Sequence, residues 1–202
     1  MIKRIAFLLL FAAVAIAQGR MDFTLSIEQP AKNTFHMTLR CDGLKGEMND
    51  FKMPAWMPGF YGLQDYARFV SSFRAADAAG KPLAWEKVTK NTWRVITAGA
   101  AAVTLDYDVA GTRNFPASSL LSESRAYLAP PGTYLHLAGQ LQRPATVAVK
   151  LPAGWSRIAT GLDPVPGKPN TYAAPDFDLL YDSPLLAGNQ ESLSFTVNDS
   201  DS

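Results

Sequence analysis

The sequence predicts an all-β protein, an antiparallel β-sandwich of roughly ten to twelve short strands with at most a short helix. Three observations predict it: apolar and polar residues alternate with a period of two, short strand-like runs recur at hairpin spacing, and turn-forming residues separate the runs. The chain of 202 residues contains 14 Gly and 14 Pro, which suit such turns. Many short strands joined by turns favour a sandwich.

The clearest alternation spans residues 22–41 and predicts an antiparallel hairpin with one solvent-exposed face and a turn at 29–33. The predicted apolar face consists of Phe23, Leu25, Ile27, Phe35, Met37, Leu39 and Cys41. Because Cys41 is the only cysteine, no intramolecular disulfide can form, and its place on the apolar face predicts a buried, inert thiol.

Shorter runs complete the predicted fold. We expect further strands at 70–75, 83–88, 93–97, 103–109, 134–137, 146–151 and 193–197. Residues 118–125 are the one candidate for a short helix, and the segment 163–175, rich in Pro and Gly, reads as a surface loop.

The first 17 residues have the three-part pattern of a secretory signal peptide. Lys3 and Arg4 precede an apolar run at 5–17, which ends in small residues, so cleavage is expected before Gln18. That run has 13 residues, fewer than the roughly 20 that span a bilayer, so an uncleaved anchor is the weaker alternative. We therefore expect residues 18–202 to form a single exported β-sandwich domain, periplasmic or secreted, without a stable membrane anchor.

Charge does not point to a nucleic-acid partner. Lys and Arg number 19 against 18 Asp and Glu, a formal net charge of +1, and the two signs are interspersed along the chain. A protein that binds nucleic acid generally carries a basic stripe instead. Nucleic acid is therefore not expected among the partners.

No catalytic motif appears in the sequence. A catalytic zinc site generally needs three protein ligands, whereas this chain has two histidines and no HExxH. His36 falls on the polar face of a predicted strand, and His136 lies inside an apolar one. GxSxG, GxGxxG and GxxxxGK are missing too. We expect no catalytic residue, metal or cofactor in this chain; a small hydrolase that uses His136 with a nearby Asp or Ser is the weakest alternative.

A cluster of carboxylates lies near the end of the sequence. Asp176, Asp178 and Asp182 surround an apolar pair, and paired carboxylates or calcium ligands are possible interpretations. Alternation of Asp with apolar residues is described more simply by a half-buried edge strand, which is the interpretation that we favour.

The least generic segment is PAWMPGFYGLQDYARFVSSFRA at 54–75. It gathers aromatic residues around a Pro-Gly dipeptide that favours a tight turn, namely Trp56, Phe60, Tyr61, Tyr66 and Phe69. Such a cluster either plugs one end of a sandwich or presents a binding face. The candidate residues for contact with a cleft or partner are Trp56, Pro58, Gly59, Tyr61, Asp65 and Arg68.

This segment resembles the front domain of the glycyl aminopeptidase family of zinc metallopeptidases (family sixty-one), in which a stretch P-x-W-x-P-G-x-Y is followed by an acidic residue. Two other stretches are similar in the same order, RAYLAPPGTY at 125–134 and DFDLLYDSPLLAG at 176–188. An Arg is usual in the family just before the acidic residue, where this chain has Gln64, and Arg68 is the candidate substitute.

The resemblance covers roughly 22–188 and implies a β-sandwich that precedes a thermolysin-like domain with HExxH. The zinc ligands and catalytic Glu of that domain have no counterpart here, so zinc is expected only in the separate catalytic domain. The first hypothesis is a non-catalytic accessory domain that packs on a peptidase domain, in cis or in trans, and helps to shape the peptide cleft. The alternative is a free-standing exported module that binds a peptide or glycan through its aromatic loop.

Overall fold

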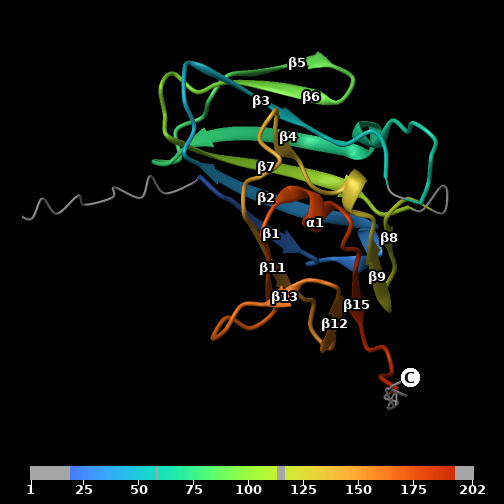
Figure 1. Cartoon of the computed structure of the whole chain (residues 1–202). Helices are drawn as coiled ribbons and strands as arrows, with labels where there is room; N and C mark the ends of the chain where they lie inside the picture. Colours follow the sequence, from blue (N-terminus) through green and yellow to red (C-terminus); the bar gives the residue numbers. More distant parts are fainter. Residues whose placement is uncertain (1–18, 58, 113–116, 194–202) are drawn as a thin grey trace, which may run out of the picture.

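We describe a computed structural model of the chain, whose described residues are 19–57, 59–112 and 117–193 (Figure 1). They form fifteen strands, three short 3-10 helices and one α-helix. In chain order these are β1 (Met21–Ser26), η1 (Pro30–Lys32), β2 (Thr34–Asp42), β3 (Met48–Lys52), η2 (Tyr66–Phe69), β4 (Val70–Asp77), β5 (Trp85–Thr89), β6 (Thr92–Ile96), β7 (Ala102–Ala110), β8 (Leu120–Leu121), β9 (Arg125–Leu128), η3 (Pro130–Gly132), β10 (His136–Leu137), β11 (Ala145–Lys150), β12 (Arg157–Thr160), β13 (Asp163–Pro164), β14 (Thr171–Ala174), α1 (Phe177–Tyr181) and β15 (Leu185–Gly188).

The strands form three sheets, which confirms the predicted all-β, sandwich-like fold. The main sheet has seven strands in the order β13-β14-β11-β1-β2-β7-β4. Two sheets of four strands accompany it, an upper sheet β10-β3-β6-β5 and a lower sheet β12-β15-β9-β8 in the view of Figure 1. Pairing is antiparallel except between β1 and β11, which run parallel.

The predicted hairpin is confirmed as β1 and β2. Its register places Phe23 opposite Leu39 and Leu25 opposite Met37, so the alternating apolar residues share one buried face. The turn contains η1 and ends at Asn33, whose φ of 51° is a left-handed conformation that Asn tolerates. The long alternating pattern therefore fixes the first two strands of the main sheet.

One continuous hydrophobic core joins all three sheets. On the β4 side, a register shift between Ser71 and Arg74 accompanies insertion of the Phe73 side chain toward the upper sheet. There its ring stacks on Trp93 at a centroid distance of 5.5 Å and meets Trp85 edge-on at 4.8 Å. Aromatic packing thus holds the upper sheet against the main sheet.

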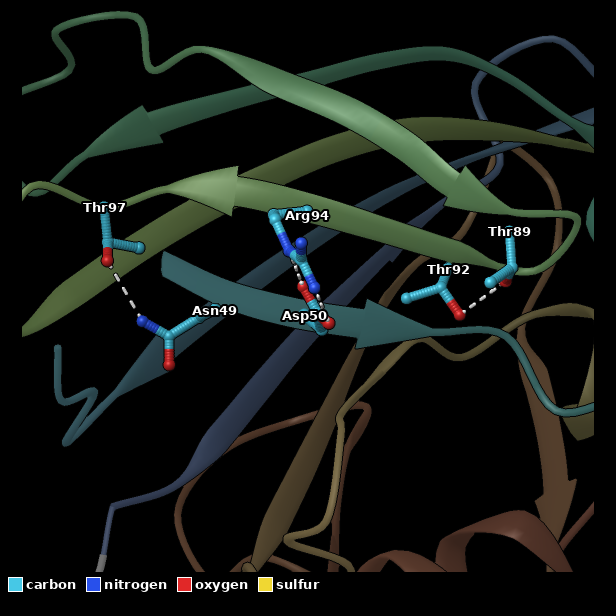
Figure 2. Close-up of polar contacts among 6 residues, drawn as sticks. All are labelled: Asn49, Asp50, Thr89, Thr92, Arg94 and Thr97. Carbon is cyan, nitrogen blue, oxygen red and sulfur yellow. Dashed lines mark hydrogen bonds and ion pairs between the residues drawn. The ribbon is translucent and has the colours of Figure 1, made fainter. Parts of the chain in front are cut away.

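The outer faces of the main and upper sheets are largely polar. On the main sheet, His36 lies 2.8 Å from Asp108 and 3.6 Å from Asp106. Figure 2 shows the corresponding face of the upper sheet, where Arg94 binds Asp50 through two hydrogen bonds of 2.8 and 2.9 Å. Hydrogen bonding to Arg94 lowers the pKa of Asp50, which therefore stays ionised. Both faces are suited to water.

Six of the seven further predicted strands are confirmed as β4, β5, β6, β7, β10 and β11. In the seventh, 193–197, Leu193 is not in a strand and the other residues lie outside the described part of the chain. The predicted signal peptide, residues 1–17, also lies outside it. The longest helix in the described residues, α1, has five residues, far fewer than a membrane-spanning helix needs.

Two local predictions are wrong. Residues 118–125 form no helix, because Leu120 and Leu121 pair with Tyr127 and Ala126 as strand β8. Residues 163–175 are not only a loop, since they contain β13 and β14, and β14 pairs with β11. In both places strand pairing overrides a weak local pattern.

We predict that Gly111→Ala destabilises the protein by roughly 1–3 kcal/mol, because overpacking at a backbone contact forces the structure to shift. A Cβ at Gly111 would lie 2.8 Å from the backbone nitrogen of Leu121 and 2.8 Å from the Phe35 ring. Gly161→Ala is the matched control, since its Cβ would meet only the Ser183 hydroxyl at 3.8 Å. Urea denaturation measures both, and equal midpoints for the two variants would contradict the prediction.

Candidate functional site

The aromatic segment forms a loop that leaves β3 and returns at η2. Its start is anchored by Asn91, whose side chain donates to the Met53 carbonyl at 2.7 Å. Its two arms are joined by a hydrogen bond of 2.8 Å from Gln64 N–H to the Ala55 carbonyl. The ends of the loop are therefore fixed by the backbone.

The tip of the loop is a tight turn, as predicted. The N–H of Phe60 donates to the Met57 carbonyl at 3.2 Å, and Gly59 has a φ of 78°, which requires glycine in a turn of this kind. Pro58, the other predicted turn residue, lies outside the described residues.

On both sides of the turn, the loop exposes large apolar side chains. Tyr61 is 84% exposed, Leu63 is 81% exposed and Trp56 is 38% exposed. The rings of Trp56 and Tyr61 are tilted toward each other, with centroids 6.3 Å apart. At these positions the predicted aromatic cluster is therefore exposed and does not plug the core.

Asp65 and Arg68 flank the start of η2. Asp65 is the N-cap residue, although its side chain makes no capping hydrogen bond. The Arg68 guanidinium lies 4.7 Å from the centroid of the Phe69 ring, a cation–π geometry. No ion pair joins Asp65 to Arg68 in the described structure, so these charges remain candidates for contact with a partner.

The three stretches that carry the family resemblance meet beneath this loop. Tyr66 in η2 is fully buried, and a Cβ placed on Gly132 in η3 would lie 3.1 Å from its ring. α1 packs near η3, with Phe177 and Leu180 buried, and the Phe177 ring lies 4.8 Å from that of His136. We call this junction of η2, η3 and α1 the corner.

The corner contains a buried stretch of backbone between strands at 129–135, whose polar groups must find partners. The Tyr107 hydroxyl donates to the Thr133 carbonyl at 2.8 Å and accepts from Leu135 N–H at 3.3 Å. Ser119 accepts from Ala129 N–H at 3.0 Å, and the Thr133 hydroxyl donates to the Ala129 carbonyl at 2.9 Å. The side chains of other elements therefore hold this segment.

The prediction of an edge strand at 176–182 is wrong. The carboxylates of this cluster lie at the ends and in the first turn of helix α1 instead. Asp176 is its N-cap and accepts from Leu179 N–H at 2.8 Å, while Asp182 is its C-cap residue. An Asp three residues before an apolar pair is a capping signal that could have revealed the helix. No group of His, Cys, Asp and Glu within the described residues could hold a metal ion.

The other candidate side chains are structural. Cys41 is fully buried as predicted, and burial raises the pKa of its thiol to about 12, so the reactive thiolate is not formed near neutral pH. Burial likewise raises the pKa of Tyr66 and Tyr181 to about 12. His136 contacts the Leu137 carbonyl at 3.2 Å through Nδ1. Within the described residues, His136 therefore has no carboxylate or hydroxyl group as a hydrogen-bond partner.

Comparison with known proteins places this geometry in a family. The family model for the Peptidase M61 N-terminal domain matches residues 22–189. The chain belongs to the Peptidase M61 N-terminal domain family. No curated protein sequence matches the chain.

A solved structure has the same fold. The crystal structure of an aminopeptidase N family protein from Idiomarina loihiensis is similar, with a TM-score of 0.75 and 22% sequence identity. The match covers 83% of this chain and 29% of that one, so the chain spans less than a third of this structural relative. The likeness at this identity concerns the fold, whereas the family match identifies a domain of a peptidase family.

We predict that Tyr107→Phe destabilises the protein by roughly 1–3 kcal/mol, because the Thr133 carbonyl and the Leu135 N–H both lose a buried partner. Tyr134→Phe is the matched control. The Tyr134 hydroxyl is also buried but has no hydrogen-bond partner in the part of the chain described, so its removal should be neutral or slightly stabilising. Chemical denaturation measures the free energy of unfolding of both variants. An equal loss in the two would contradict a stabilising role for the Tyr107 hydrogen bonds.

We predict that the free energy of unfolding depends on pH through His136. Burial is the main cause that lowers the pKa of His136, and Lys52 lowers it further. The hydrogen bond to the Leu137 carbonyl and the charge of Asp178 act in the opposite direction. The unfolded chain then binds a proton first as the pH falls, near the usual value of about 6.5. Stability is therefore present above that value and is lost as the pH falls toward the lower folded pKa. The loss between about pH 7.5 and pH 5.5 should be smaller in His136→Gln than in His36→Gln; the same loss in both would refute it.

Proposed function

We propose that this domain is a non-catalytic accessory domain that packs on the zinc-dependent catalytic domain of a peptidase, in the same chain or as a separate partner. Membership of the Peptidase M61 N-terminal domain family supports an accessory role. The single observation that carries the proposal is the exposed apolar loop of Trp56, Tyr61 and Leu63, which stands on a corner built from the three family stretches. Zinc and the chemistry of peptide cleavage belong to the catalytic domain.

In this proposal the loop forms one wall of the cleft that receives the amino-terminal part of a peptide. Aromatic side chains supply contact area at low entropic cost, and exposed groups of this kind mark protein contacts. Asp65 and Arg68 lie next to these apolar groups and provide charges for the rim of the contact. Export through the predicted signal peptide would put the complex in the periplasm or outside the cell.

We predict that adding the domain to a catalytic domain of the same family, prepared without its own front domain, raises its aminopeptidase activity or its melting temperature. The double variant Tyr61→Ala/Leu63→Ala should bind about tenfold more weakly or worse, because both side chains are exposed contact groups rather than core residues. Met48→Ala/Ile96→Ala is the control, since these exposed apolar residues lie on the upper sheet instead.

If the native domain changes neither the activity nor the melting temperature of the catalytic domain, the proposal is contradicted. If the isolated domain instead captures peptides or glycans and loses them on Trp56→Ala, the free-standing binding module is the correct function. Peptide hydrolysis by the purified domain that a chelator abolishes would contradict its non-catalytic role.

A further inference from the structure

One buried cation in the described structure has no anionic partner. Arg143 lies between β10 and β11, two residues before β11 begins, and the residue is only 5% exposed. The ion pairs among the described residues involve Arg20, His36 and Arg94, and none involves Arg143. A buried charge without a counterion costs free energy, so an anion that reaches this guanidinium gains a strong partner.

The guanidinium of Arg143 is held at one end of the main sheet by neutral acceptors. Its Nε–H donates to the side-chain oxygen of Gln140 at 2.6 Å. Its two terminal nitrogens donate to the backbone carbonyls of Asp42 and Gly43, the second at 2.9 Å. Asp42 is the last residue of β2, so these bonds tie the residues before β11 to the end of β2. They orient the side chain and supply no negative charge.

Part of the guanidinium is left to bind a ligand. A guanidinium has five N–H hydrogens in a planar fork, and the three bonds to Gln140, Asp42 and Gly43 use three of them. Two N–H groups of Arg143 therefore have no partner in the part of the chain that the structure describes. Gly19 lies directly against the group, since a Cβ placed on Gly19 would be 2.8 Å from Cζ of Arg143. A side chain there would displace the guanidinium.

A cavity opens beside this guanidinium. It has a volume of about 260 Å³, and its lining residues are Gly19, Gly139, Gln140, Leu141, Gln142 and Arg143. No Asp or Glu is among these residues, so the cavity has no fixed negative charge at its wall. The Gln140 amide oxygen accepts from Arg143, which leaves the amide nitrogen as a further donor. Leu141, 36% exposed, adds an apolar wall.

We propose that this cavity binds a small organic carboxylate, whose oxygens pair with the free N–H groups of Arg143. A carboxylate and a guanidinium are both planar and match in the spacing of their donors and acceptors. One carboxylate balances the single buried charge, and Leu141 gives the apolar part of the ligand a surface to contact. Inorganic phosphate is tetrahedral and more highly charged near neutral pH, so it fits this single planar cation less well.

Titration calorimetry of the purified protein with propionate, in a chloride buffer of constant ionic strength, tests the site. We expect saturable binding of one propionate per chain, several times tighter than the binding of inorganic phosphate. No saturable binding of propionate would overturn the proposal, and phosphate that binds as tightly would overturn the assignment to a carboxylate. No catalytic domain takes part in this experiment, so the site and the proposed packing on a peptidase stand or fall separately.

The variant Gln140→Glu links the binding to Arg143. It puts a carboxylate where the Gln140 oxygen accepts from Nε, so the chain supplies the missing charge itself. Propionate should then bind about tenfold more weakly or worse, since the ligand no longer meets an unpaired charge. Gln29→Glu is the matched control, because it adds the same charge at an exposed position beyond the other end of β1 and should bind propionate as the native protein does. Equal affinity in the two variants would contradict the site.

A second measurement needs no variant. In the nuclear magnetic resonance spectrum of the native protein, the Nε–H signal of Arg143 should shift as propionate is added and stay in place when sodium chloride is added to the same concentration. The Nε–H signals of Arg20 and Arg94, which are already paired with carboxylates, should not move. An unmoved Arg143 signal would overturn the proposal even if propionate binds elsewhere on the protein.

Discussion

The constraint on which the rest of the structure depends is the burial of an irregular backbone segment, residues 129–135. A strand satisfies its polar groups by pairing, whereas this segment contains two prolines and one turn of 3-10 helix. Hydroxyl groups from β7 and from the residues before β8 replace the missing pairing. Tyr107 and Ser119 therefore give this segment hydrogen-bond partners while it is buried next to η2.

From that constraint the position of the exposed loop follows. η3 supports Tyr66, and Tyr66 fixes the end of the loop whose other end is tied to Asn91 through Met53. α1 supports the same junction, with its first turn capped by Asp176. Three stretches far apart in the sequence are therefore parts of one structural unit.

The sequence predicted the fold best where a strand is long and half-buried. β2 and β7 each have nine residues with strict alternation, and both were predicted to within a few residues. β12, β13 and β14 have two to four residues, and Ala174 is the single buried residue among them, so no periodicity marks them. At 176–182 the alternation of Asp with apolar residues suggested a strand, whereas the carboxylate of Asp176 satisfies a helical N–H instead.

The candidate site was predictable in composition but not in exposure. The aromatic residues of the loop look alike in sequence, yet Tyr66 is buried and Tyr61 is almost fully exposed five residues earlier. The difference arises because Gly59 and the hydrogen bond between Gln64 and Ala55 turn the loop outward, which only the folded backbone reveals.

A loop whose two ends are fixed in this way has fewer backbone conformations open to it than a free loop, which bears on the proposed contact with a partner. Most of the ordering cost of a contact is then met on folding rather than on binding. The buried hydrogen bonds support Tyr66, and Tyr66 ends the exposed aromatic loop. The interactions that stabilise the corner therefore also position the start and end of the exposed loop.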